Sequence, residues 1–331
     1  MKLKIAGVTV VSISILLTAA VLGPRVSILI DLDPNSAAQT VIVESIAADS
    51  KGFLYVCDRV SGNVWRIDPK KPKLTVVGRV EERQIQGTKI RADASGLVFN
   101  QEGDLFIASG PFAEVLRIRS RDLDPDKPGV AQTFATYTEG ANGVAVDKNG
   151  NLYASGGRNG KIYRTGREGG KADVIAQIPT HTRVLPDGKT QQSITANGLV
   201  FDGAGTTLYV ADTARGAIWK VVIEPDGRAG QPIVVAQSAL LEGADGPAFD
   251  PRDNLWVAAN ERNAVVIVTS DGKVIDIAKN GSKGPLEFPT SVVFVGGTAY
   301  VSNFDTPRRD NLSADGSSID GIGASIVKIE P

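Results

Sequence analysis

The sequence predicts an all-β fold, because a unit of about 50 residues recurs along most of the chain. In each copy a polar residue comes just before a short apolar strand, which is followed by a turn and a second strand. The clearest copy covers residues 195–202 and 207–212. Its second strand is rich in β-branched and aromatic residues. Its turn contains Asp and Gly, which tolerate the conformations of tight hairpins.

The polar residue before the first strand gives one position per repeat, which we call the column position. Its six copies lie 45–55 residues apart and are Glu44, Ser95, Asn142, Asn197, Asp245 and Thr290. A period of about 40–50 residues with several strands per repeat is typical of β-propellers. We therefore predict a six-bladed β-propeller with four-stranded blades over residues 39–331.

The two ends of this domain suggest how the ring closes. The last repeat shows only three strands before Pro331, whereas residues 39–43 precede the first repeat without belonging to it. We predict that this N-terminal strand supplies the missing fourth strand of the last blade, since closure removes open sheet edges.

The N-terminal segment differs from the repeats. Lys2 and Lys4 come before an apolar run over residues 5–22, a pattern typical of a secretory signal. The run is also close to the length needed to span a bilayer. We therefore expect residues 1–23 to be a signal peptide or a membrane anchor and residues 24–38 to be a linker. The domain is then secreted, periplasmic or extracellular, and membrane-attached through residues 5–22 if they are not cleaved.

Composition excludes some function classes. The 331 residues carry a formal net charge of −1, without the basic excess expected of a nucleic-acid partner. Cys57 is the only cysteine, so packing and strand pairing hold the fold without an internal disulfide.

The chemistry of the column positions indicates a metal site. Equivalent positions in a propeller lie at the same height and face the central channel, and all six residues offer oxygen. Such donors suit one Ca²⁺ in the channel, whereas Mg²⁺ prefers fewer protein ligands and a strict octahedron. Zinc is disfavoured because His181 is the only histidine. A single such residue would be explained by turn chemistry, but the residue type changes from repeat to repeat, which favours a site assembled once.

The repeats resemble those of the SMP-30/gluconolactonase/LRE-like family, whose relatives include diisopropyl-fluorophosphatases and, more distantly, paraoxonases. The most specific match is Ala196–Asn197–Gly198–Leu199 followed by residues 209–213. The resemblance implies a six-bladed calcium-dependent propeller in which Glu44, Asn197 and Asp245 hold the metal. It places Asn142 either as a fourth ligand or as a substrate contact. Gly140 departs from the arginine usual in sugar lactonases, which puts a sugar-acid lactone in doubt.

The resemblance also implies an activity, the hydrolysis of lactones or related esters. Asp245 is then the catalytic residue, as general base or as nucleophile. Four further residues are expected to contact the substrate together with Asn142: Ser95, His181, Thr290 and Asn303. The alternative is a non-catalytic propeller that binds a ligand or partner protein, with calcium as a structural plug.

Overall fold

The computed structural model describes residues 23–34, 40–185, 187–281, 284–304 and 323–330. In these ranges the chain consists of strands, loops and three short 3-10 helices, so the all-β prediction is confirmed. The helices are η2 (Ser120–Asp122), η3 (Ala239–Leu241) and η4 (Asn260–Arg262).

Most strands form antiparallel groups that follow the sequence repeats. The first group is β2 (Val43–Ala48), β3 (Leu54–Asp58), β4 (Asn63–Ile67) and β5 (Leu74–Arg79), and the second is β8 (Ala94–Phe99), β9 (Leu105–Ser109), β10 (Glu114–Ile118) and β12 (Gln132–Thr136). The third is β13 (Val144–Val146), β14 (Leu152–Ser155), β15 (Lys161–Thr165) and β17 (Asp173–Gln177), and the fourth is β20 (Leu199–Phe201), β21 (Thr207–Asp212), β22 (Ala217–Val222) and β23 (Ile233–Gln237).

The remaining repeats share one sheet, joined where Gly246 and Ser291 pair in parallel. It contains β24 (Ala244–Phe249), β25 (Leu255–Ala259), β26 (Ala264–Val268) and β27 (Val274–Lys279), then β28 (Pro289–Val295), β29 (Thr298–Asn303), β30 (Ser325–Glu330) and β1 (Arg25–Asp31). Short strands extend or decorate the sheets: β6 (Arg83–Ile85), β7 (Thr88–Ile90), β11 (Gly129–Val130), β16 (Gly170–Lys171), β18 (Thr182–Val184) and β19 (Thr190–Gln192).

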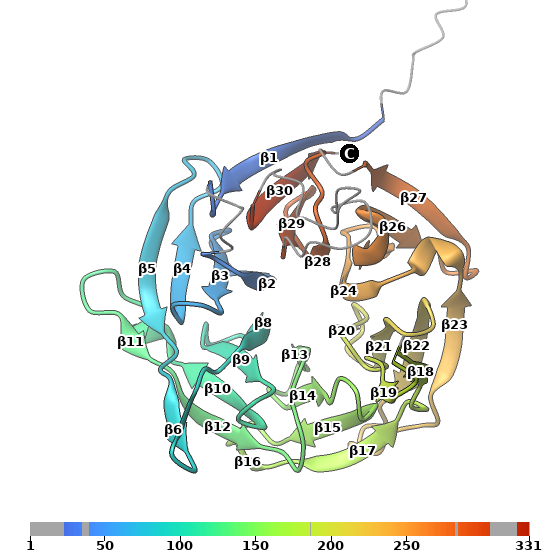
Figure 1. Ribbon diagram of the computed structural model, residues 1–331, viewed down its shortest axis with the longest axis horizontal. Coiled ribbons are helices and arrows are strands. Elements are labelled where there is room, and N and C mark those ends of the chain that lie inside the picture. Colours follow the sequence, from blue (N-terminus) through green and yellow to red (C-terminus); the bar gives the residue numbers. More distant parts are fainter. Residues whose placement is uncertain (1–22, 35–39, 186, 282–283, 305–322, 331) are drawn as a thin grey trace, which may run out of the picture.

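The sheets are arranged around a common centre. The first strand of each repeat lies innermost, and β5, β12, β17, β23 and β27 lie at the periphery (Figure 1). Each innermost strand contacts the innermost strand of the next repeat, and β28 contacts β2. This arrangement brings the beginnings of distant sequence repeats together.

The N-terminal strand lies earlier in the sequence than we predicted. β1 pairs antiparallel with β30 along the last sheet, whereas residues 40–42 form no strand and residue 39 lies outside the described residues. Residues 25–31, predicted as linker, are therefore strand. Two causes explain this strand. The β-branched residues Val26, Ile28 and Ile30 favour extended backbone. The edge of β30 that faces away from β29 is the edge with which β1 pairs.

Two predictions concern segments that the structure barely describes. Residues 1–23, predicted as signal or anchor, lie outside the described residues except for Gly23, and the predicted loop over 304–323 lies outside them except at its two ends. Among the residues that are described, no helix is long and apolar enough to cross a membrane.

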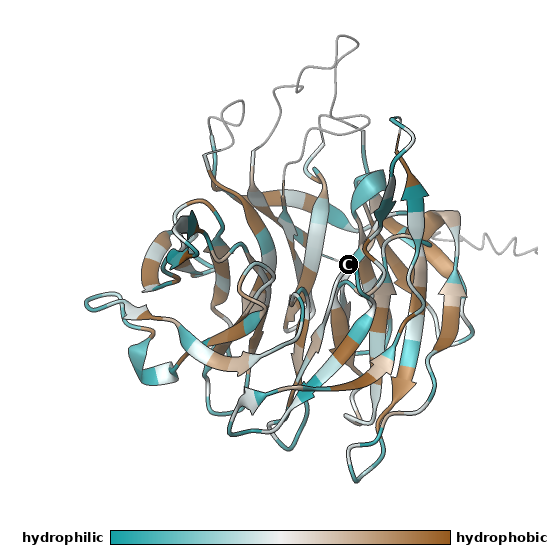
Figure 2. Cartoon of the chain, turned by 60° about the horizontal axis from the view of Figure 1, so that its bottom comes forward, coloured by the Kyte–Doolittle hydropathy of each residue, from teal (hydrophilic) through white to brown (hydrophobic). Residues whose placement is uncertain are grey.

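Apolar side chains pack between adjacent sheets, and one aromatic contact recurs at these interfaces. The ring of a Tyr or Trp on the second strand of one repeat meets, edge to face, the Phe that ends or nearly ends the first strand of the next. Centroids are 4.8–5.2 Å apart in the pairs Tyr55–Phe99, Tyr153–Phe201, Tyr209–Phe249 and Trp256–Phe294. Hydrophobic residues follow the strands and hydrophilic ones the connecting turns (Figure 2). Repeated packing of this kind sets the spacing between sheets.

Candidate active site

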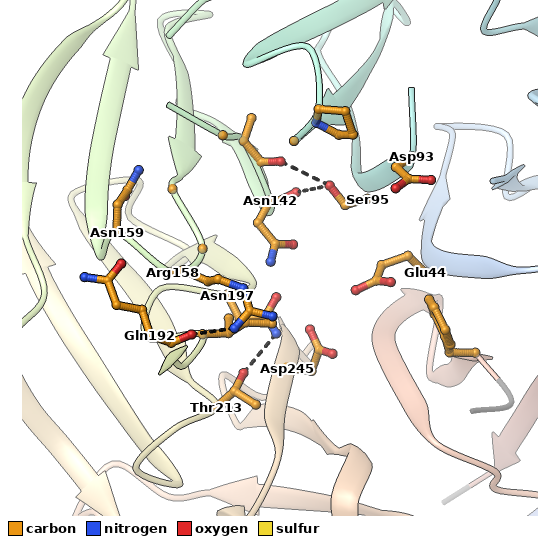
Figure 3. Close-up of a pocket in the computed structure, with 18 of the residues that line it drawn as sticks. Glu44, Asp93, Ser95, Asn142, Arg158, Asn159, Gln192, Asn197, Thr213 and Asp245 are labelled. Atoms are coloured by element: carbon orange, nitrogen blue, oxygen red, sulfur yellow. Dashed lines mark hydrogen bonds between the residues drawn. The ribbon is translucent and has the colours of Figure 1, made fainter. Parts of the chain in front are cut away.

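Two cavities meet at the column residues. The larger, of about 660 Å³, is lined by column residues and by the loops that follow the second strands. The smaller, of about 350 Å³, is lined by the innermost strands themselves. Glu44, Asn142, Asn197 and Asp245 line both cavities. Their side chains converge on one space from four different repeats (Figure 3).

Backbone irregularities direct several of these side chains. The strand register shifts between Val43 and Ile46, and again between Ala244 and Pro247. Glu44 and Asp245 lie inside these shifts. A β-bulge bends the strand and re-aims a side chain, so a residue that would otherwise pack between sheets can face the channel.

Glycine after the column position lets the innermost strands approach closely. A Cβ on Gly143 would lie 2.7 Å from the carbonyl oxygen of Asn197, and one on Gly198 would lie 2.7 Å from that of Asp245. Real Cβ atoms do not come so close to backbone. In repeats two to five the residue after the column position is glycine, and the absence of a side chain there allows the innermost strands, and with them the site residues, to come together.

Three site residues are held by the residue that directly follows the second strand of their own repeat. We call this the post-strand position. Arg59 Nη1 donates to Glu44 Oε2 at 2.8 Å, and Asn260 Nδ2 donates to Asp245 Oδ2 at 3.0 Å. In the fourth repeat Thr213 holds Asn197, whose Nδ2 donates to the threonine hydroxyl at 2.9 Å.

The two carboxylates, Glu44 and Asp245, are buried and repel each other. Burial raises the pKa of Glu44, although the Arg59 guanidinium acts against this effect. Burial, and then the negative charge of Glu44, raise the pKa of Asp245 well above its ordinary value, against the hydrogen bond from Asn260. Two desolvated carboxylates that repel each other are stabilised by a cation between them.

The donor set fits a hard cation. In the described part of the chain, no group of three or more His, Cys, Asp and Glu side chains is placed to hold a metal. A cation in this channel would therefore depend on the amide oxygens of Asn142 and Asn197 as well as on the two carboxylates. Carboxylate and amide oxygens are ligands that Ca²⁺ accepts, with water in the remaining places.

The other predicted residues divide into two groups. Ser95 lines the larger cavity, but its hydroxyl donates to the carbonyl oxygen of Asn142 at 2.9 Å. Thr290 lines only the smaller cavity and is hydrogen-bonded to Ser302.

Asn303 and His181, which we expected to contact the substrate, are not among the residues that line either cavity. Asn303 is fully buried, and its amide donates to Pro285 and Ser325. His181 stands before the hairpin β18–β19, and the returning end of that hairpin, Gln192, lines the larger cavity instead.

Our reading of the sequence missed the post-strand positions. All six line the larger cavity: Arg59, Gly110, Gly156, Thr213, Asn260 and Phe304. Aligning the repeats on the ends of their second strands, instead of on the starts of their first strands, would have shown a second position that varies in residue type in the same way.

Fold and site together define an all-β, propeller-like protein with a polar site at its centre. Residues 182–303 match the model of the SMP-30/Gluconolactonase/LRE-like region. The family resemblance seen in the sequence is therefore confirmed over that part of the chain.

Relatives and a solved structure agree with this match. The chain is 25% identical over 266 residues to a 6-deoxy-6-sulfogluconolactonase of Pseudomonas putida, covering 79% of this chain and 81% of that protein. It is 24% identical over 235 residues to lactonase drp35 of Staphylococcus aureus strain MW2, covering 70% and 67%. A gluconolactonase structure from Xanthomonas campestris superposes with a TM-score of 0.63 at 15% identity, covering 93% and 89%. At this identity the structural likeness shows the fold alone.

Proposed function

We propose that this protein is a calcium-dependent hydrolase of lactones or related esters. The observation that carries the proposal is the convergence of Glu44, Asn142, Asn197 and Asp245 where the two cavities meet. The substrate class follows from the relatives, which are named as lactonases.

Each converging residue has a proposed role. Glu44, Asn197 and Asp245 hold the cation, and Asn142 either completes the ligand set or contacts the substrate. A bound Ca²⁺ would supply Lewis-acid polarisation of the ester carbonyl and would stabilise the negative charge that develops on its oxygen.

Asp245 is the proposed group that transfers the proton during hydrolysis. Asp245 accepts a proton from the attacking water as that water's oxygen bonds to the carbonyl carbon. The bond between the carbonyl carbon and the ring oxygen breaks, and Asp245 returns the proton to the departing oxygen, so that the product is a hydroxy acid. The cavity of about 660 Å³ falls within the range of about 300–1,000 Å³ that small-molecule sites occupy.

We also infer a closed six-bladed ring and an exported protein. The circuit of contacts between innermost strands, with β28 against β2, supports ring closure. The pairing of β1 with β30 supplies a fourth strand to the last repeat. The basic and apolar N-terminal sequence supports export.

The test is hydrolysis of a panel of aliphatic and sugar-derived lactones, with and without EGTA, by the unmodified protein and by Asp245→Ala. We expect turnover that requires both calcium and Asp245. Calcium binding by a folded protein that hydrolyses none of the panel would refute the hydrolase and favour a binding propeller. Turnover that persists in EGTA would refute the role of calcium.

A further inference from the structure

The post-strand positions differ in whether their side chain is hydrogen-bonded to a column residue, and the positions that are bonded belong to the repeats of the proposed metal ligands. Three of them carry side chains that are hydrogen-bonded to column residues, namely Arg59, Thr213 and Asn260. These three belong to the repeats of Glu44, Asn197 and Asp245. In the repeats of Ser95 and Asn142 the same position is Gly110 or Gly156. Side-chain support is therefore given to three column residues and withheld from Ser95 and Asn142.

The fourth repeat shows what this support does. The hydroxyl of Thr213 lies 2.7 Å from the carbonyl oxygen of Ala244 and 2.9 Å from Nδ2 of Asn197. A carbonyl oxygen only accepts, so the single hydroxyl proton of Thr213 is committed to Ala244. The hydroxyl oxygen can then only accept from Asn197, which must present its NH₂ group to Thr213.

This polarity determines which atom of Asn197 faces the channel. An amide has its oxygen and its NH₂ on opposite sides of one planar group. With the NH₂ directed to Thr213, the Oδ1 atom is left for the converging space. The opposite orientation would set Oδ1 against a hydroxyl that has no proton to give, and would direct two N–H donors toward a cation.

The other two supported residues follow the same rule. Asn260 donates to one oxygen of Asp245, and Arg59, which has only donors, donates to one oxygen of Glu44. In each case the supporting side chain takes one atom of the column residue and leaves an oxygen for the channel. Asn142 has no side-chain hydrogen bond among those found in the described residues, so its amide is not oriented in this way.

We propose that Thr213 is a positioning residue that selects the oxygen-inward orientation of Asn197 and thereby sets the affinity of the channel for Ca²⁺. This inference rests on the proposed calcium site. Thr213 is also hydrogen-bonded to Ala244, the residue before Asp245, and so connects the amide of Asn197 to the backbone beside the Asp245 carboxylate. Outer partners of metal ligands typically change metal affinity by about 10–100-fold when removed.

The experiment measures Ca²⁺ binding by titration calorimetry on the full chain. Thr213→Val keeps the shape of the side chain but removes the hydroxyl, and we expect its Kd to rise about 10–100-fold. Thr213→Ser keeps the hydroxyl and should restore most of the affinity. Thr206→Val is the matched control, because Thr206 belongs to the same repeat and, within the described residues, its hydroxyl is hydrogen-bonded to the turn residue Asp202 and not to a column residue. Its Kd should stay unchanged.

Thermal unfolding in EGTA separates positioning from folding. Without calcium we expect Thr213→Val to unfold at a lower temperature than Thr213→Ser, because the carbonyl oxygen of Ala244 loses a donor. The Kd values are therefore compared at a temperature at which both variants are folded. If Thr213→Val does not fold, Thr213→Ala also removes the hydroxyl and leaves no methyl group beside the carbonyl oxygen of Ala244.

Three results would overturn the inference. A Thr213→Val or Thr213→Ala protein that binds Ca²⁺ as tightly as the unmodified chain would show that the hydroxyl has no role. A Thr213→Ser protein as weak as Thr213→Val would show that the hydroxyl is not the cause. Absence of Ca²⁺ binding by the unmodified chain would refute the proposed function as well, and so differs from the first two results.

Discussion

Gly198→Ala tests whether the close approach of the innermost strands assembles the site. A Cβ at this position would lie 2.6 Å from Cα of Gly246 and 2.6 Å from Cδ of Pro247. Both distances are about 0.8 Å shorter than ordinary contacts, which begin near 3.4 Å. The obstructing atoms are backbone or proline ring, which cannot turn aside as a flexible side chain can. The strands β20 and β24 must therefore move apart.

The cost of this movement can be bounded. Overpacking in a well-packed interior typically destabilises a protein by about 1–3 kcal/mol. For a domain of about 150–250 residues, 1 kcal/mol lowers Tm by about 2–4 °C, and the shift is smaller in a longer chain, so we expect a fall of at most about 12 °C. Because the movement separates Asn197 from Asp245, Ca²⁺ affinity should fall as well.

The assay compares thermal unfolding and calorimetric Ca²⁺ titration of Gly198→Ala with those of Gly166→Ala. No atom lies within 4 Å of a Cβ built on Gly166, and its backbone is not in the left-handed region. Loss of chain entropy in the unfolded state should make that control neutral or more stable by about 0.4–1 kcal/mol. Equal Tm values and equal Ca²⁺ affinities for the two variants would refute the close-approach argument.

Three further outcomes are expected. Asp245→Asn should lower kcat/KM on any lactone that the protein hydrolyses by at least about 10²-fold, and a variant with full activity in a calcium-supplemented assay would remove Asp245 from the chemistry. Ser155→Ala should lower the free energy of unfolding by about 1–3 kcal/mol, because the buried Ser155 hydroxyl donates to the carbonyl oxygen of Asn197; urea unfolding with an unchanged midpoint would contradict this. Burial alone would raise the pKa of Asp250, but hydrogen bonds led by those from Asn254 lower it below its ordinary value. The ionised form of Asp250 thus stabilises the fold above the ordinary pKa of about 3.9, and this stability is lost as pH falls through the lower folded-state pKa. Urea unfolding of Asp250→Asn should accordingly show its largest deficit near pH 7 and a smaller one below pH 4, and a deficit independent of pH would refute the role of the charge.

The fold class was predictable because its signals are local. Turn residues and β-branched strands appear within each copy of the repeat, the period appears on comparing neighbouring copies, and these signals agree with one another. The outermost strand of the last sheet was placed wrongly for the opposite reason. Residues 25–31 and 39–43 both look like strand, and only the position of β30 in space decides which of them pairs with it.

Part of the site was predictable from the repeat as well. The column position is fixed by the repeat, so residues as distant as Glu44 and Asp245 could be placed together without a structure. Asn303 and His181 were chosen for their chemistry alone. Neither is among the residues that line the two cavities, and no repeat placed them at the column.

A repeat makes variation informative in a way that a single motif does not. Thr213 and Asn260 directly follow equivalent strands, β21 and β25, yet differ in residue type. What differs is the partner: an amide that needs an acceptor in one repeat and a carboxylate that needs a donor in the other. The hydrogen-bonding needs of the column residue account for the residue found at the post-strand position. In the second and third repeats the post-strand position is glycine. The hydroxyl of Ser95 is instead held by the backbone of Asn142, and Asn142 has no side-chain hydrogen bond among those found in the described residues. This difference is consistent with a centre in which three residues are held rigid for the cation while Asn142 can adjust to a substrate.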